Sequence, residues 1–102
     1  MKLTVVRYKT KPEQADENAR LIGQVFAELQ AKAPQDVRYL SLRLPDGTFM
    51  HVSVAETEDG VSPIPKLAAF GLFQSGIKER CVEPPKSSDA TIVGSYRMLG
   101  EA

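Results

Sequence analysis

The feature that most constrains the fold of this chain is a β-hairpin signal of about 20 residues. Residues 37–44 (VRYLSLRL) alternate in polarity, the tripeptide PDG follows at 45–47, and residues 48–56 (TFMHVSVAE) are again rich in β-branched and aromatic side chains. Pro, Asp and Gly in this order are typical of a type I turn followed by a left-handed glycine, which forms a three-residue hairpin loop. The sequence therefore predicts two antiparallel strands joined at 45–47.

This loop length also predicts the register, with Leu44 opposite Thr48. One face of the hairpin is then aliphatic, and the other mixes aromatic, polar and basic side chains. Because aliphatic surfaces commonly pack under helices, we expect the mixed face, which carries the chain's one histidine, to be free of helices. The aliphatic face contains Leu40, Leu42, Met50, Val52 and Val54, and the mixed face contains Tyr39, Ser41, Arg43, Phe49, His51 and Ser53.

The remaining elements complete a β-α-β-β-α-β order. Residues 3–9 read as a strand with Val6 and Tyr8 on the helix-free face, and apolar residues at helical spacing predict a helix over 13–32. A second helical stripe runs over 67–81, EPPKSSD reads as a loop, and 91–99 reads as the last strand. This order predicts an α+β, ferredoxin-like fold: a four-stranded antiparallel sheet of order 4-1-3-2 with two helices on one face.

Composition narrows the possible functions. The 102 residues suit one domain, 1–102, and 13 basic side chains balance 13 acidic ones. Neutral charge argues against a nucleic-acid partner, and no apolar run is long enough to span a membrane. Cys81 is the single cysteine and no metal-ligand spacing is present, so we expect no metal, and a cytoplasmic location.

Four segments of the chain resemble the antibiotic biosynthesis monooxygenase (ABM) family of the dimeric α+β barrel superfamily. These segments are VVRYKTKPEQADENARL, RYLSLRLPDGTFMHVSVAET, LAAFGLFQSGIKERC and VGSYRML. The resemblance covers nearly the whole chain and lies in element order and apolar pattern. It implies a ferredoxin-like protomer, a homodimer formed through the helix-free sheet face, and a pocket for a small-molecule ligand. The exposed aromatic residues expected on that face, Phe49 and Tyr39, also favour a homodimer.

The resemblance implies two kinds of chemistry. Haem-degrading relatives use an Asn, Trp and His set, but this chain has no Trp and Asn18 falls on the polar side of its helix, so haem degradation is disfavoured. Other relatives oxidise polycyclic aromatic substrates with dioxygen and no cofactor, using polar groups that deprotonate a phenolic substrate. On that basis the expected catalytic residues are His51, Tyr39 and Arg43, and the expected substrate-binding residues are Ser41, Phe49, Ser53 and Tyr8.

Other interpretations remain open at this point. His51 can equally be an interface histidine bonded to Ser41 or Tyr39, and Arg43 a salt-bridge residue at a dimer rim. A non-catalytic ligand-binding or stress-responsive dimer of the same fold is the main alternative to an oxygenase. An RNA-recognition domain shares the element order, but the chain lacks the basic-Gly-aromatic run of that module. An enclosed, mainly apolar cavity with converging polar groups would favour an enzyme.

Overall fold

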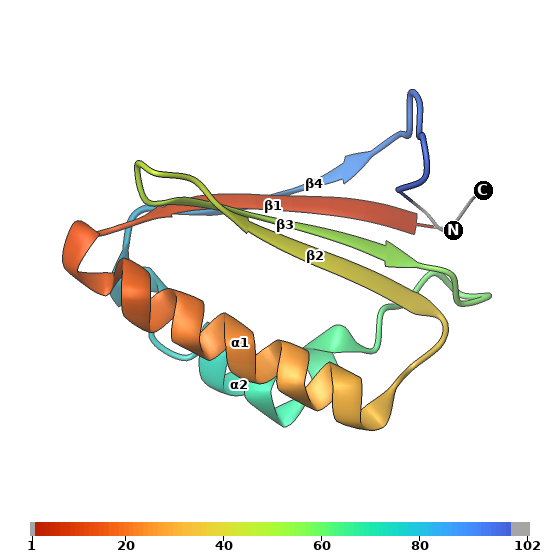
Figure 1. Cartoon of the computed structure of the whole chain (residues 1–102), viewed down its shortest axis with the longest axis horizontal. Coiled ribbons are helices and arrows are strands. Elements are labelled where there is room, and N and C mark those ends of the chain that lie inside the picture. Colours follow the sequence, from red (N-terminus) through yellow and green to blue (C-terminus); the bar gives the residue numbers. More distant parts are fainter. Residues whose placement is uncertain (1, 99–102) are drawn as a thin grey trace.

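The protein folds as a four-stranded antiparallel sheet with its helices on one face, in the order β2-β3-β1-β4 (Figure 1). The computed structural model describes residues 2–98. The ferredoxin-like α+β class and the strand order agree with the prediction. The elements are β1 (Lys2–Thr10), η1 (Pro12–Gln14), α1 (Ala15–Lys32), β2 (Val37–Arg43), β3 (Thr48–Ala55), η2 (Ile64–Lys66), α2 (Ala68–Gln74), α3 (Ile77–Arg80) and β4 (Cys81–Ala90).

The hairpin between β2 and β3 has the predicted loop and register. Gly47 has a φ of 87°, a left-handed conformation that glycine adopts without steric cost. The Leu44 N–H donates to the Thr48 carbonyl at 2.8 Å, and the Gly47 N–H donates to the Leu44 carbonyl at 3.1 Å. Ser41 therefore pairs with His51, as the three-residue loop predicted.

The prediction of which face lies under the helices was wrong. His51 and Phe49 are only 5% and 2% exposed and pack toward the helices, whereas Leu40 and Leu42 are 43% and 45% exposed. Tyr8 is likewise buried in the core between sheet and helices. Aromatic rings bury more apolar area per side chain than Leu or Val, and in this core they stack on one another. The mixed face is therefore the inner face, and the aliphatic face is the outer one.

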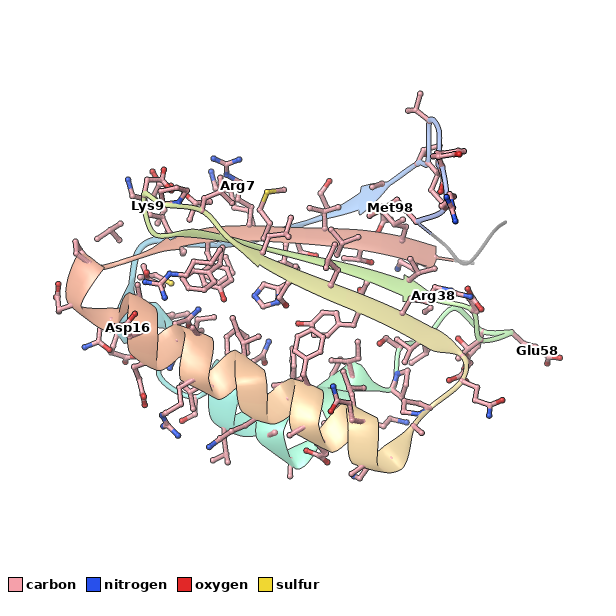
Figure 2. The ribbon with its side chains drawn as sticks, viewed as in Figure 1. Arg7, Lys9, Asp16, Arg38, Glu58 and Met98 are labelled. Carbon is pink, nitrogen blue, oxygen red and sulfur yellow. The ribbon has the colours of Figure 1, made fainter. Side chains whose placement is uncertain are left out.

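Aromatic stacking joins α1 to the sheet. The ring of Phe26, on α1, stacks on Tyr39 at a centroid distance of 5.1 Å. On the sheet itself, Tyr8 stacks on Phe49 at 5.6 Å and on His51 at 5.4 Å. Figure 2 shows the opposite arrangement for Arg7, which alternates with Tyr8 along β1 and points away from the helices.

The first helix is close to its prediction, whereas the second differs from it. Ala33, with a φ of 47°, ends α1, and its N–H donates to the Leu29 carbonyl. The predicted second helix is interrupted at Ser75, which is extended, and at Gly76, which has a φ of 79°. Two shorter helices, α2 and α3, result because the backbone turns sharply at this glycine.

The last strand lies earlier than predicted. β4 includes the EPPKSSD segment that the sequence indicated as a loop, and residues 91–98 form no strand; Leu99, the end of the predicted strand, lies outside the described residues. β4 is an edge strand, so Pro84 and Pro85 are tolerated where an N–H bond to a further strand is not required. A register shift between β1 and β4 near Arg7 and Lys9 accommodates them.

None of the helices within residues 2–98 is long and apolar enough to cross a membrane.

Candidate functional site

The imidazole of His51 lies at the centre of a buried group of hydroxyls. Its Nδ1 atom is 2.7 Å from the Tyr39 hydroxyl and 2.8 Å from the Ser41 hydroxyl. Its Nε2 atom is 2.8 Å from the Tyr8 hydroxyl. The strand register explains this convergence, because Ser41 pairs with His51 across β2–β3 and His51 pairs with Val6, two residues before Tyr8, across β3–β1.

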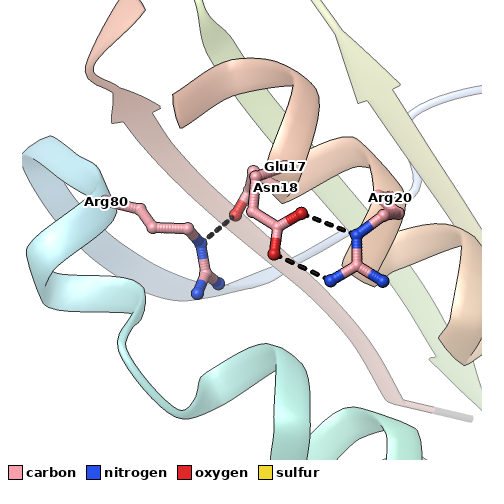
Figure 3. Close-up of polar contacts among 4 residues, drawn as sticks. All are labelled: Glu17, Asn18, Arg20 and Arg80. Atoms are coloured by element: carbon pink, nitrogen blue, oxygen red, sulfur yellow. Dashed lines mark hydrogen bonds and ion pairs between the residues drawn. The ribbon is translucent and has the colours of Figure 1, made fainter. Parts of the chain in front are cut away.

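The hydrogen bonds around His51 extend from Tyr8 to side chains of the helices. Asn18, on α1, is completely buried and donates from Nδ2 to the Tyr8 hydroxyl oxygen at 2.8 Å. Arg80, at the end of α3, donates from Nε to Oδ1 of Asn18 at 3.0 Å (Figure 3). The same guanidinium donates to the carbonyls of Ser75 and Phe73, where α2 ends. Because the helix is interrupted at Gly76, Arg80 can bind both the carbonyls at the end of α2 and the side chain of Asn18.

A cavity of about 260 Å³ opens beside His51, between the sheet and α2. Its walls are mainly apolar, and its polar members are hydroxyl, amide or imidazole groups. Among the described residues no Asp, Glu, Lys or Arg lines it. The lining residues include Val6, Ile64, Pro65, Phe70, Phe73 and Ile77 as apolar walls and Thr4, Tyr8, Tyr39, His51, Ser53, Ser62 and Gln74 as polar ones.

Burial sets the protonation of the three central groups. It lowers the pKa of His51 to about 4, because a charged imidazolium is poorly solvated there. It raises the pKa of Tyr39 to about 12. Burial likewise raises the pKa of Tyr8 well above its usual value, although the hydrogen bond from Asn18 opposes this shift. At neutral pH the site therefore contains a neutral imidazole and two neutral phenols.

The structure brings most of the expected site residues together on the helix side of the sheet. His51, Tyr39, Tyr8 and Ser53 line the cavity. Ser41 binds His51, and Phe49 stacks behind Tyr8, as described above. These residues share one face of the sheet, as the register predicted, but that face is the inner one.

Arg43 lies outside this group. Its side chain is 46% exposed and forms an ion pair at 3.0 Å with Asp16, at the start of α1. Its guanidinium carbon is 5.9 Å from the centre of the Phe49 ring, and neither residue lines the cavity. Arg43 therefore forms a salt bridge within its own chain, and the position at a dimer rim stays a prediction.

Asn18 and Arg80 were missed as members of the site. The helical spacing contains the signal for Asn18, since residues 18, 22 and 25 follow one stripe of α1 and all three are buried. Arg80 likewise continues the spacing of Phe73 and Ile77. Asn18 was expected on the polar side of its helix, and Arg80 was not among the expected site residues, but both are buried.

Groups of three or more side chains able to hold a metal ion are absent from the described part of the chain. The site consists of phenols, hydroxyls, an amide, an imidazole and a guanidinium. The imidazole and hydroxyls can pass protons, the amide and guanidinium can orient them, and the cavity beside them suits an apolar ligand.

Comparison with solved structures shows which proteins share this fold. A protein from Nitrosomonas europaea described as a candidate antibiotic biosynthesis monooxygenase superposes with a TM-score of 0.72 at 16% identity, over 92% of this chain and 100% of that chain. One so described from Caulobacter crescentus CB15 gives 0.73 at 16% identity, over 91% and 90%. A Nitrosomonas europaea protein of unknown function gives 0.70 at 18% identity, over 93% and 92%.

Neither a family model nor a curated protein matches the sequence. The structural matches establish the fold: this chain has the α+β, ferredoxin-like fold of the antibiotic biosynthesis monooxygenases. The resemblance noted in the sequence is thereby confirmed for the fold.

Proposed function

We propose that this protein binds a compact aromatic molecule with an ionisable hydroxyl group and oxidises it with dioxygen, without metal or flavin. The observation that carries the proposal is the position of His51. A neutral, buried imidazole contacts two tyrosine hydroxyls that line an apolar cavity. Such an arrangement serves general-base catalysis on a ligand that the cavity keeps away from water.

The cavity selects the ligand by size and charge. Its volume of about 260 Å³ lies just below the roughly 300–1,000 Å³ typical of small-molecule pockets. This volume suits a ligand of two or three fused rings. The absence of charged side chains from its described lining disfavours a carboxylate or an ammonium ligand, because neither would find a counter-charge there.

Proton removal is the first chemical step. The phenolic hydroxyl of the ligand loses its proton to His51 and the hydroxyls bonded to it, and His51 then carries the positive charge as imidazolium. The low pKa of His51 reflects the cost of an isolated buried cation, and a phenolate formed beside it offsets part of that cost. Tyr39 remains protonated at neutral pH and can donate a hydrogen bond to the phenolate. This donation replaces the electrostatic role expected of Arg43.

Electron transfer to dioxygen follows from the anion. Anthrone is a suitable probe because its enol form is a phenol and its methylene carbon can be oxidised. The enolate gives one electron to dioxygen, the resulting radicals combine as a peroxide at that carbon, and loss of water leaves the quinone. The balance is one anthrone and one dioxygen to one anthraquinone and one water, so no external reductant is needed.

The proposal includes a homodimer formed through the outer face of the sheet. Leu40 and Leu42 are each more than two-fifths exposed, and Met50 and Val52 beside them are half-buried. Contiguous exposed aliphatic residues on a sheet face are typical of an interface. A second copy of the same face would cover them, since an isologous dimer pairs one patch with itself.

The test measures oxygen uptake with anthrone, together with binding of 2-naphthol followed by its fluorescence. His51→Ala should lower turnover by at least about a hundredfold, the lower end for loss of a general base, while 2-naphthol still binds. His51→Gln, which keeps a hydrogen-bonding side chain, guards against a folding defect. Binding without oxidation by the unaltered protein would instead identify a non-catalytic ligand-binding protein.

A further inference from the structure

Arg80 and Asn18 are buried polar residues that do not line the cavity. Arg80 is 7% exposed, and Asn18 is fully buried. All three side-chain hydrogen bonds that the structure gives Arg80 go to neutral acceptors: the Asn18 amide and the carbonyls of Ser75 and Phe73. A buried cation held by neutral acceptors is costly to desolvate. Arg80 is linked to His51 through Asn18 and Tyr8, which suggests that it acts on the hydrogen bonds of His51.

The chemistry of the guanidinium fixes the orientation of the Asn18 amide. Arginine has donors and no acceptor, so the atom of Asn18 that faces it is the carbonyl oxygen. The amide nitrogen of Asn18 then points at the Tyr8 oxygen and donates to it. With the amide reversed, two donors would face each other at the arginine, which is unfavourable.

The direction set at Asn18 continues to the imidazole. Because Tyr8 accepts a hydrogen bond from Asn18, its own proton is directed to Nε2 of His51, 2.8 Å away. Nε2 then acts as an acceptor, and in a neutral imidazole the ring proton lies on Nδ1. There it meets the hydroxyl oxygens of Tyr39 and Ser41. Each residue thus donates to the next, from Arg80 to Asn18, from Asn18 to Tyr8 and from Tyr8 to His51.

We propose that Arg80 and Asn18 are positioning residues that set the tautomer of His51 and thereby make Nε2, reached through Tyr8, its proton-accepting atom. This inference rests on the proposed function for its catalytic consequence, although the tautomer itself exists without a ligand. The ligand O–H bond breaks as its proton passes to the Tyr8 oxygen. Tyr8 at the same time gives its own proton to Nε2, which leaves an anionic ligand and an imidazolium. The Tyr39 proton remains available to the anion.

The tautomer can be measured directly, because His51 is the one histidine of the chain. In protein labelled with ¹⁵N-histidine, long-range ¹H–¹⁵N correlation spectra at pH 7 distinguish the protonated ring nitrogen from the bare one. The unaltered protein should carry its ring proton on Nδ1. Asn18→Asp replaces the amide donor with a carboxylate that accepts the Tyr8 proton, so the ring proton should move to Nε2, which then donates to Tyr8.

The neighbouring ion pair on α1 offers matched controls. Glu17 and Arg20 bind each other at 2.6 Å on the exposed side of the helix, and Glu17 immediately precedes the buried Asn18 (Figure 3). Glu17→Gln makes the reverse carboxylate–amide exchange and should leave the tautomer unchanged. Arg80→Gln should give a mixture of tautomers because the Asn18 amide loses its fixed orientation, whereas Arg20→Gln should have no effect.

Turnover of anthrone supplies the second readout. Asn18→Asp should lower kcat at least about tenfold, since a misdirected base loses part of its typical hundred- to ten-thousand-fold contribution, with little change in 2-naphthol binding. A ring proton on Nε2 in the unaltered protein, or on Nδ1 in folded Asn18→Asp, would overturn the inference. If the unaltered protein leaves anthrone unoxidised, the proposed function fails, and the spectra still decide the tautomer.

Discussion

The two faces of the β2–β3 hairpin are built from alternate residues of the same strands, yet they have opposite surroundings. The inner face buries Phe49 and His51, and its polar atoms bind one another. The outer face exposes Leu40 and Leu42. A half-polar surface can therefore form a core when its polar groups satisfy each other, while an aliphatic surface remains available for another chain. Polarity alone does not decide which face a helix covers.

The largest expected difference between the faces is in packing energy. Phe49→Ala should lower the free energy of unfolding by about 3–5 kcal/mol, as is typical when a fully buried Phe is truncated. Met50→Ala, at the next position on the outer face, should cost clearly less because Met50 is half-buried. Urea unfolding of the two variants measures the difference. Equal losses would mean that the two faces are equally packed.

The second difference is in pH dependence, which only the inner face should show through its histidine. The pKa of His51 is about 4 in the folded protein and about 6.5 when unfolded, so below pH 6.5 the unfolded state binds the extra proton. The stability that depends on neutral His51 is fully present above pH 6.5 and falls by about 3 kcal/mol as the pH drops to 4.

The comparison protein for this titration is His51→Gln. It keeps the carboxylates that titrate in the same range and lacks the imidazole. Its free energy of unfolding, followed by urea titration between pH 7 and pH 4, should fall by about 3 kcal/mol less than that of the unaltered protein. Parallel pH dependence in the two proteins would place the imidazole in contact with water.

A third difference is in self-association, which should depend on the outer face alone. Leu42→Glu places a negative charge from each protomer in the proposed apolar interface and should shift the protein to monomer. Because Leu42 is 45% exposed in the single chain, this change should affect the stability of the monomer by only about 0.5 kcal/mol. Sedimentation equilibrium at micromolar concentration provides the measurement. A monomeric unaltered protein of 11.2 kDa would exclude the dimer.

The smallest effect is expected at Arg43, which lies at the edge of the inner face. Its ion pair with Asp16 is exposed, and exposed pairs contribute about 0–1 kcal/mol. Arg43→Gln should therefore leave the unfolding midpoint and anthrone turnover nearly unchanged. A hundredfold loss of turnover in this variant would return Arg43 to the catalytic role expected from the sequence.

Much of the fold could be predicted because local turn chemistry determines it. The PDG loop set the register of β2 and β3, and with it the grouping of His51, Tyr39 and Ser41 on one face. The choice of face could not be read from the hairpin, because it depends on what the helices present. Phe26 meets Tyr39 and Asn18 meets Tyr8 only in the folded chain.

The errors in the second half of the chain have a similar origin. Pro84 and Pro85 are typical of loops, and their place in β4 depends on that strand being at the edge of the sheet. The spacing of 67–81 is compatible with a buried Arg80, but it does not indicate that the interruption at Gly76 places Arg80 against Asn18. Long-range contacts of this kind place the donors Asn18 and Arg80 beside Tyr8, and a local sequence pattern does not contain them.

The central claim is that His51 is a buried neutral imidazole on the inner face. Its direct test is the titration of the ring carbon protons by NMR between pH 3 and pH 8, with no overlap because the chain has one histidine. The ring should remain neutral through pH 6 and be half-protonated at about pH 4. If the protein unfolds near that pH, protonation of the ring should accompany unfolding. A midpoint near the ordinary value of about 6.5 in the folded protein would contradict the buried site.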